Sequence, residues 1–278
     1  MEGKFKVILT LIDFTQASLH AAEEAALIAV KFDSELHLIH IGPDKKSGAR
    51  ITDNDNLKTD LLENVKKDLE KRFSVRITCF IYEGEFVDIV RKHVKIFSIG
   101  LVVMGARKRN WFKEIFIKNK KRLLIKYAGS EVLYVHCDSG TATFKKIVLP
   151  VGKFISKKKI TIAYEFAKKF SSNIHLVALN KQENALDKKS AGSLIASYRY
   201  LRDITNMPIE CNTIVGKNLA DATMQYADVI GADLILIDED AESDLKMALW
   251  KGKIFNHSLV TVMSVQSVPD RSKIKYRA

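Results

Sequence analysis

The chain has 278 residues, of which 47% are hydrophobic and 28% charged, the composition of a globular protein rather than a disordered one. No apolar run approaches the roughly 20 residues that span a bilayer, and the first residues lead into a strand pattern without a signal peptide, so we expect a cytoplasmic protein without membrane insertion. The net charge of +12 suits anionic partners or a lysine-rich surface, and the three cysteines lack the spacing of a metal site.

Short apolar runs alternate with helix-period segments along the first half of the chain. They predict strands at 5–12, 35–41, 75–82, 99–104 and 131–136, and helices at 18–32, 57–73, 85–97 and 111–127. The second half repeats the alternation, with strands near 145–151, 173–179, 208–214, 233–238 and 260–265. Strands that are apolar along their whole length and are separated by helices predict parallel, doubly wound α/β sheets covered on both faces.

Four segments of the first half recur in the second half in the same order, which indicates a duplication. The matched segments are 6–11 with 146–151, 35–39 with 173–177, 77–79 with 209–211, and 100–104 with 232–237. The offset drifts from 140 to 132 positions, as loop deletions would produce. We therefore predict two tandem domains, 1–140 and 141–278, with a polar linker at 138–143 and a basic tail from about residue 267.

Strand ends and turns carry a recognisable set of residues. Asp13 ends the first strand, Gly84 and Gly216 precede the third helix of each copy, and the fourth strand ends in Leu101-Val102-Val103-Met104-Gly105. With the duplication, these features resemble the tandem form of the universal stress protein family over nearly the whole chain. The resemblance implies two five-stranded, Rossmann-like parallel sheets with strand order 3-2-1-4-5. It also implies a role in stress adaptation, and pairing of domains or of chains in a homo-oligomer through the last strands, 131–136 and 260–265.

Nucleotide-binding members of that family carry G-x-x-G, nine residues and then G-[ST] after the fourth strand, because glycines let the backbone approach phosphate oxygens. In the first copy Gly105 and Asp13 match the family pattern, but Lys108 replaces the second glycine and Lys118-Asn119 replaces G-[ST]. These five residues form the candidate cofactor-binding site, a residual nucleotide site in which two lysines stand where backbone would approach a ligand. We expect no cofactor, with ATP disfavoured.

The second copy departs further from the pattern. Gly152 stands where the aspartate would be, and the segment 238–244 has five acidic residues in seven, which would repel phosphate. We therefore expect the second copy to bind no ATP.

Nine basic residues and several aromatic ones lie between 107 and 127. They indicate either an amphipathic helix with solvated lysines or a surface for nucleic acid or another anion. His37 and His175 occupy matching positions in the second strands, which favours a packing role for both.

The sequence contains no Walker A, G-x-S-x-G or HExxH motif, so we expect neither an enzyme nor a metal protein. The leading interpretation is a non-catalytic stress protein that acts through contacts with a protein partner. One alternative is a sensor of ATP or another phosphate ligand in the first copy. A second alternative is a binder of nucleic acid or an anionic surface through the basic helix at 107–126.

Overall fold

The structure is a computed structural model that describes residues 5–42, 54–106, 129–137, 143–152, 156–180, 188–238, 245 and 260–265. Its first half contains β1 (Val7–Leu11), α1 (Gln16–Phe32), β2 (Glu35–Gly42), α2 (Asn54–Phe73), β3 (Ile77–Glu83), α3 (Phe86–Phe97), β4 (Leu101–Ala106) and β5 (Glu131–His136). The second half contains β6 (Lys146–Val151), α6 (Lys157–Phe170), β7 (Asn173–Asn180), α7 (Lys188–Ile204), β8 (Ile209–Val215), α8 (Leu219–Ile230), β9 (Leu234–Asp238) and β10 (Thr261–Val265).

The ten strands of the described residues belong to one sheet with the order β3-β2-β1-β4-β5-β10-β9-β6-β7-β8. Starting from the outer strand of each half, β3 or β8, the strands follow the predicted order 3-2-1-4-5. The strands within each half are parallel. The doubly wound α/β class is therefore confirmed. The predicted helix at 111–127, the linker residues 138–142 and the tail from 267 lie outside the described residues, and the domain boundary at 140 stays a prediction.

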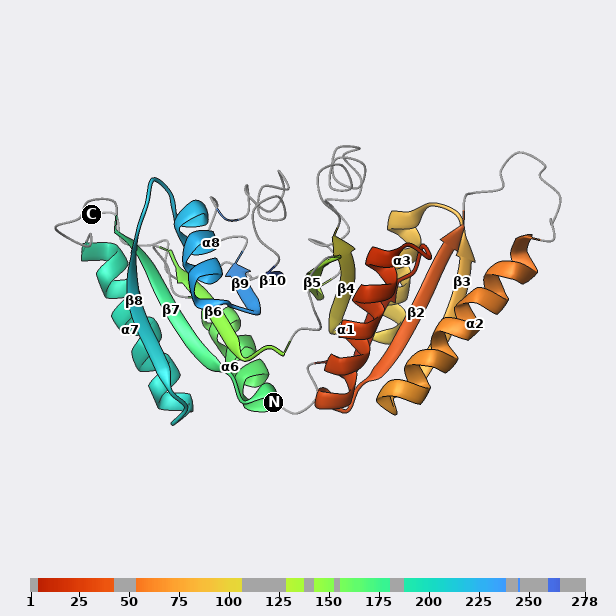
Figure 1. The fold of residues 1–278 in the computed structure, drawn as a ribbon, viewed down its shortest axis with the longest axis horizontal. Helices are drawn as coiled ribbons and strands as arrows, with labels where there is room; N and C mark the ends of the chain where they lie inside the picture. Colours follow the sequence, from red (N-terminus) through yellow and green to blue (C-terminus); the bar gives the residue numbers. More distant parts are fainter. Residues whose placement is uncertain are drawn as a thin grey trace.

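The two halves meet through their last strands. β5 and β10 pair antiparallel, with Val262 opposite Tyr134 and Ser264 opposite Val132, so the two predicted sheets are halves of one continuous sheet (Figure 1). The expected strand pairing thus takes place within one chain, where β5 and β10 cover each other.

The pairing also corrects the alignment of the two copies. Val7 pairs with Glu35 and Lys146 pairs with Asn173, so the first strands superpose with an offset of 139, one less than the sequence match of 140 suggested. A one-residue shift exchanges the two faces of a strand, so only the offset of 139 assigns equivalent residues to the same core.

Helices cover both faces of the sheet. α1, α2, α6 and α7 contribute to one hydrophobic core, and α3 and α8 contribute to the core on the opposite face (Figure 1). None of the helices in the described part of the chain is long and apolar enough to cross a membrane.

The first of these cores runs through both halves. The ring of Phe166 in α6 lies 5.1 Å from that of Phe32 in α1 and 5.9 Å from that of Phe5. An ion pair also joins the halves, since Lys158 Nζ lies 2.8 Å from a carboxylate oxygen of Glu131, whose side chain is buried in β5. The halves are therefore joined by side-chain packing as well as by the strand pair.

Candidate functional site

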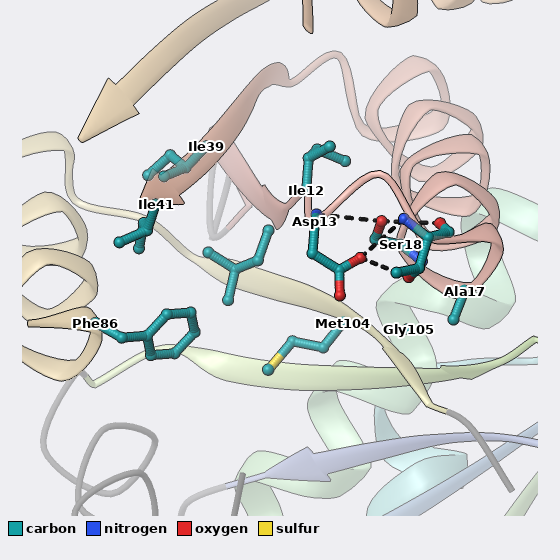
Figure 2. A pocket seen from close by; sticks show the side chains of 11 residues that line it. Ile12, Asp13, Ala17, Ser18, Ile39, Ile41, Phe86, Met104 and Gly105 are labelled. Carbon is teal, nitrogen blue, oxygen red and sulfur yellow. Dashed lines mark hydrogen bonds between the residues drawn. The ribbon is translucent and has the colours of Figure 1, made fainter. Parts of the chain in front are cut away.

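A cleft of about 100 Å³ opens at the carboxyl ends of β1 and β4 (Figure 2). The chain leaves β1 toward β2 on one side and reaches β4 on the other, so this is the point where the strand order reverses. Open α/β sheets bind their ligands at such a point. The residues that line the cleft are Leu11, Ile12, Asp13, Thr15, Ala17, Ser18, Ile39, Ile41, Phe86, Met104 and Gly105.

Asp13 lies at the rim of the cleft, next to the first turn of α1. Its Oδ1 accepts hydrogen bonds from the Thr15 backbone N–H at 3.0 Å and from the Thr15 hydroxyl. Thr15 is the N-cap of α1, and its side chain accepts a hydrogen bond from the Ser18 backbone N–H. The carboxylate thus holds the cap and places a negative charge near the positive end of the helix dipole.

Gly105 has a packing role of its own. A Cβ at this position would lie 2.1 Å from the backbone oxygen of Ala17, so the glycine lets α1 approach β4 closely. A glycine is needed here whether or not a nucleotide binds, and Gly105 alone is therefore no sign of a phosphate site.

The inner wall of the cleft is apolar. Figure 2 shows Ile39 and Ile41 from β2, Phe86 from the start of α3 and Met104 from β4 around the space beside Asp13. Pockets that bury a drug-sized molecule have volumes of roughly 300–1,000 Å³. The described part of this cleft, at about 100 Å³, therefore fits a small apolar group rather than a whole nucleotide.

The structure brings two of the five predicted site residues together. Asp13 and Gly105 line the same cleft. Lys108, Lys118 and Asn119 lie outside the described residues, as does the basic segment 107–126.

In the second half a cavity of about 10 Å³ lies between β6, α6 and α7, and Pro150, Lys159 and Ser197 are among the residues that line it. Lys159, in the first turn of α6, is buried there, and its Nζ donates a hydrogen bond at 2.5 Å to the carbonyl oxygen of Pro150. Pro150 belongs to β6, so the side chain of Lys159 reaches the carboxyl end of that strand.

Asp238 is the structural counterpart of Gly105. The two residues stand four positions after Leu101 and Leu234, which pair with the equivalent residues Ile8 and Ile147. Asp238 is the last residue of β9, in agreement with the predicted strand at 233–238, and it is fully buried and paired with Val265 of β10. Residues 239–244 of the acidic segment lie outside the described part.

A polar network that sequence reasoning missed lies between the sheet and α3. His37 Nδ1 is 2.9 Å from His93 Nε2, and His93 Nδ1 is 3.1 Å from the hydroxyl of Tyr82. At the other end, His37 Nε2 is 3.2 Å from Oε1 of Glu35, which also accepts a hydrogen bond from Thr78 at 2.6 Å. Both histidines are almost completely buried, and the sequence signalled only the repeat-equivalent pair His37 and His175.

Burial governs the protonation of this network. It lowers the pKa of His93 to about 4, helped by the nearby His37, and it lowers the pKa of His37 despite the opposing effect of Glu35. The hydrogen bond from Thr78 lowers the pKa of Glu35, so this carboxyl group is ionised at neutral pH.

Within the described residues, no group of three or more histidine, cysteine, aspartate or glutamate side chains is arranged to hold a metal ion.

Residues 4–136 match the sequence model described as the universal stress protein family. No curated protein matches the chain.

Solved structures share the fold over nearly the whole length. A universal stress protein from Archaeoglobus fulgidus superposes with a TM-score of 0.72 at 15% identity, covering 96% of this chain and 100% of its own. A putative universal stress protein from Pseudomonas aeruginosa gives a TM-score of 0.56 at 15% identity, over 94% of this chain and 93% of its own. The cytoplasmic domain of a prokaryotic cation chloride cotransporter gives 0.58 at 12% identity, over 94% and 95%. At these identities the likeness shows the fold alone.

Proposed function

We propose, from the premise that residues 4–136 form a domain of the universal stress protein family, that this chain is a non-catalytic tandem member acting in stress adaptation through protein contacts. Its second half serves the assembly and binds no nucleotide. Its first half keeps a small cleft in which a nucleotide binds weakly at most.

The environment of Lys159 in the second half carries this proposal. Lys159 stands three residues after the N-cap of α6, as Ser18 of the cleft does in α1, and its amino group donates a hydrogen bond to the carbonyl of Pro150. Asp238 adds a buried carboxylate at the position of Gly105. A phosphate there would lie beside a carboxyl group and would have to compete with the Pro150 carbonyl for the buried amino group of Lys159.

The chemistry of the first cleft supports the absence of catalysis. Its described lining offers one carboxylate, two hydroxyls and apolar side chains, without a histidine, cysteine or lysine. A hydroxyl nucleophile needs an adjacent base, and Asp13 is instead hydrogen-bonded to the cap of α1. The arrangement holds the helix in place rather than activating a nucleophile.

A second candidate function is a sensor of a nucleotide or another phosphate ligand in the first half. It is favoured by the position of the cleft at the point where the strand order reverses, with Asp13 at its rim. Such a sensor would also use Gly105, Lys108, Lys118 and Asn119.

Titration calorimetry with ATP at physiological salt distinguishes the proposed function from that of a nucleotide sensor. We expect no saturable binding tighter than about 100 μM, which corresponds to roughly 5.5 kcal/mol. The protein purified at low salt should likewise carry no stoichiometric adenine absorbance at 260 nm.

Two aspartate variants test whether any ATP binding depends on the cleft. Asp13→Ala removes the carboxylate at the rim of the cleft, and Asp88→Ala removes an equal charge from the first turn of α3 without touching the cleft lining. A stoichiometric ATP complex that survives Asp88→Ala and disappears in Asp13→Ala would establish the sensor and refute the proposal.

A further inference from the structure

The hydrogen bonds beneath α3 can be satisfied in only one proton order at neutral pH. The Glu35 carboxylate only accepts, so His37 must donate from Nε2, and its Nδ1 must accept. His93 must then donate from Nε2 and accept at Nδ1, where the Tyr82 hydroxyl donates. Both imidazoles are neutral in this arrangement, and each ring nitrogen has a hydrogen-bond partner between Tyr82 at one end of the network and Glu35 at the other.

One added proton leaves all these bonds in place. If His93 gains a proton at Nδ1, it donates to the oxygen of Tyr82. The proton between the two facing nitrogens can then shift across 2.9 Å to His37, where Glu35 stabilises the positive charge. The network therefore absorbs one proton by reversing the direction of its donors.

A second proton cannot be accommodated in this way. Both histidines would then carry N–H groups on the two nitrogens that face each other at 2.9 Å, and both rings would be charged. The other neighbours of the pair cannot relieve this, since the rings of Phe80 and Phe97 pack against it. Among the described residues, the other titratable or charged groups that face the pair are Glu35 of β2, Tyr82 of β3 and, beyond Glu35, Arg76 before β3.

We propose that the His37–His93 pair is an acid-sensitive latch between the sheet and α3, which holds when the pair carries no proton or one and opens when both rings are protonated. Opening moves His93, and with it α3, away from β2 and β3. Since Phe86 at the start of α3 lines the cleft, acidification changes the shape of the cleft. The latch itself does not depend on what the cleft binds.

The sign of the pH dependence follows from burial. In the open state His93 takes up a proton near its ordinary pKa of 6.5, whereas in the closed state it does so only near 4. The open state therefore binds more protons between these values. Closure is fully stabilised above pH 6.5 and weakens as the pH falls toward 4.

The second half provides an internal control. α3 and α8 are both 12 residues long, and Tyr226 of α8 stands at the position of His93. His175 Nδ1 lies 3.0 Å from the Tyr226 hydroxyl, which also accepts a hydrogen bond from Asn212, and 3.3 Å from Oε2 of Glu210. Burial lowers the pKa of His175 too, against the opposing effect of Glu210. This half has one histidine where the first has a facing pair, so it has no second imidazole to protonate.

Hydrogen exchange of the full chain tests the latch. After correction for intrinsic rates, we expect the protection of amides in α3 to fall at least about tenfold between pH 7 and pH 4.5, one pKa unit being a tenfold change in a proton-binding ratio. Amides in α8, which faces one buried histidine rather than two, should lose clearly less protection than those in α3. In His93→Gln, whose amide still donates to His37 but does not titrate, the α3 loss should disappear, whereas His20→Gln on α1 should leave it unchanged.

Equal losses in α3 and α8, or an undiminished loss in His93→Gln, would overturn the proposal. If that variant fails to fold, imidazole ¹⁵N shifts of the unaltered protein at neutral pH decide the matter. The Nε2–H form is expected for both His37 and His93, and an Nδ1–H form of either ring would refute the proton order on which the latch rests.

Discussion

Replacing Phe166 by alanine is expected to lower the free energy of unfolding by about 3–5 kcal/mol, the usual cost of removing a fully buried aromatic ring. Beyond the general cost of the cavity, the change removes contacts on both sides of the interface between the halves. The ring of Phe166 packs against Phe5 and Phe32 of the first half and against Phe144 and Phe170 of the second. Denaturant unfolding followed by circular dichroism measures the loss.

A matched control is Ile96→Ala, at a side chain that is 71% exposed on α3, and it should change the stability by less than about 0.5 kcal/mol. Because the core is shared, both halves of the unaltered protein should unfold in one transition. Trp111 and Trp250 are the two tryptophans, one in each half, so single-tryptophan variants can report each half separately. Two well-separated midpoints would show that the halves are energetically independent.

The second large effect is expected at Gly105. In Gly105→Ala the new Cβ would lie 2.1 Å from the Ala17 backbone oxygen, so either α1 or β4 must move. Forced overpacking of this kind costs about 1–3 kcal/mol, and we expect the upper end because backbone rather than a flexible side chain is in the way. Gly105→Val should be worse still.

Gly192 in α7 is the matched control, because a Cβ there meets nothing within 4 Å. Gly192→Ala should stabilise the protein by about 0.5–1 kcal/mol, through the lower backbone entropy cost of alanine in a helix. Thermal unfolding of both variants provides the comparison. If Gly105→Ala were as stable as Gly192→Ala, the close approach of α1 to β4 would be wrong.

Periodicity predicted the strands and helices of both halves because each apolar run is long enough to be buried on both sides. It did not predict the offset of the first strands. Lys6 and Lys146 match in the sequence, but a strand that is apolar along its whole length does not reveal which side chains face which side of the sheet. The strand pairing does reveal this, since Val7 pairs with Glu35 and Lys146 pairs with Asn173.

The candidate site was also predictable only in part. Asp13 and Gly105 follow strand ends, so their place in one cleft could be expected from topology. The buried state of Asp238 could not, since an acidic residue beside other acidic residues is typical of a loop. The contact of His37 with His93 joins positions 56 apart and depends on the packing angle of α3, which no local pattern contains.

The antiparallel pair of β5 and β10 has an evolutionary consequence. A dimer of two identical chains cannot lose one ligand site alone, because every substitution occurs in both subunits. Fusion of the copies keeps the two partners at an effective concentration on the order of millimolar, whatever the dilution of the protein in the cell. Each copy can then diverge under a different constraint, as the glycine at 105 and the aspartate at 238 have done.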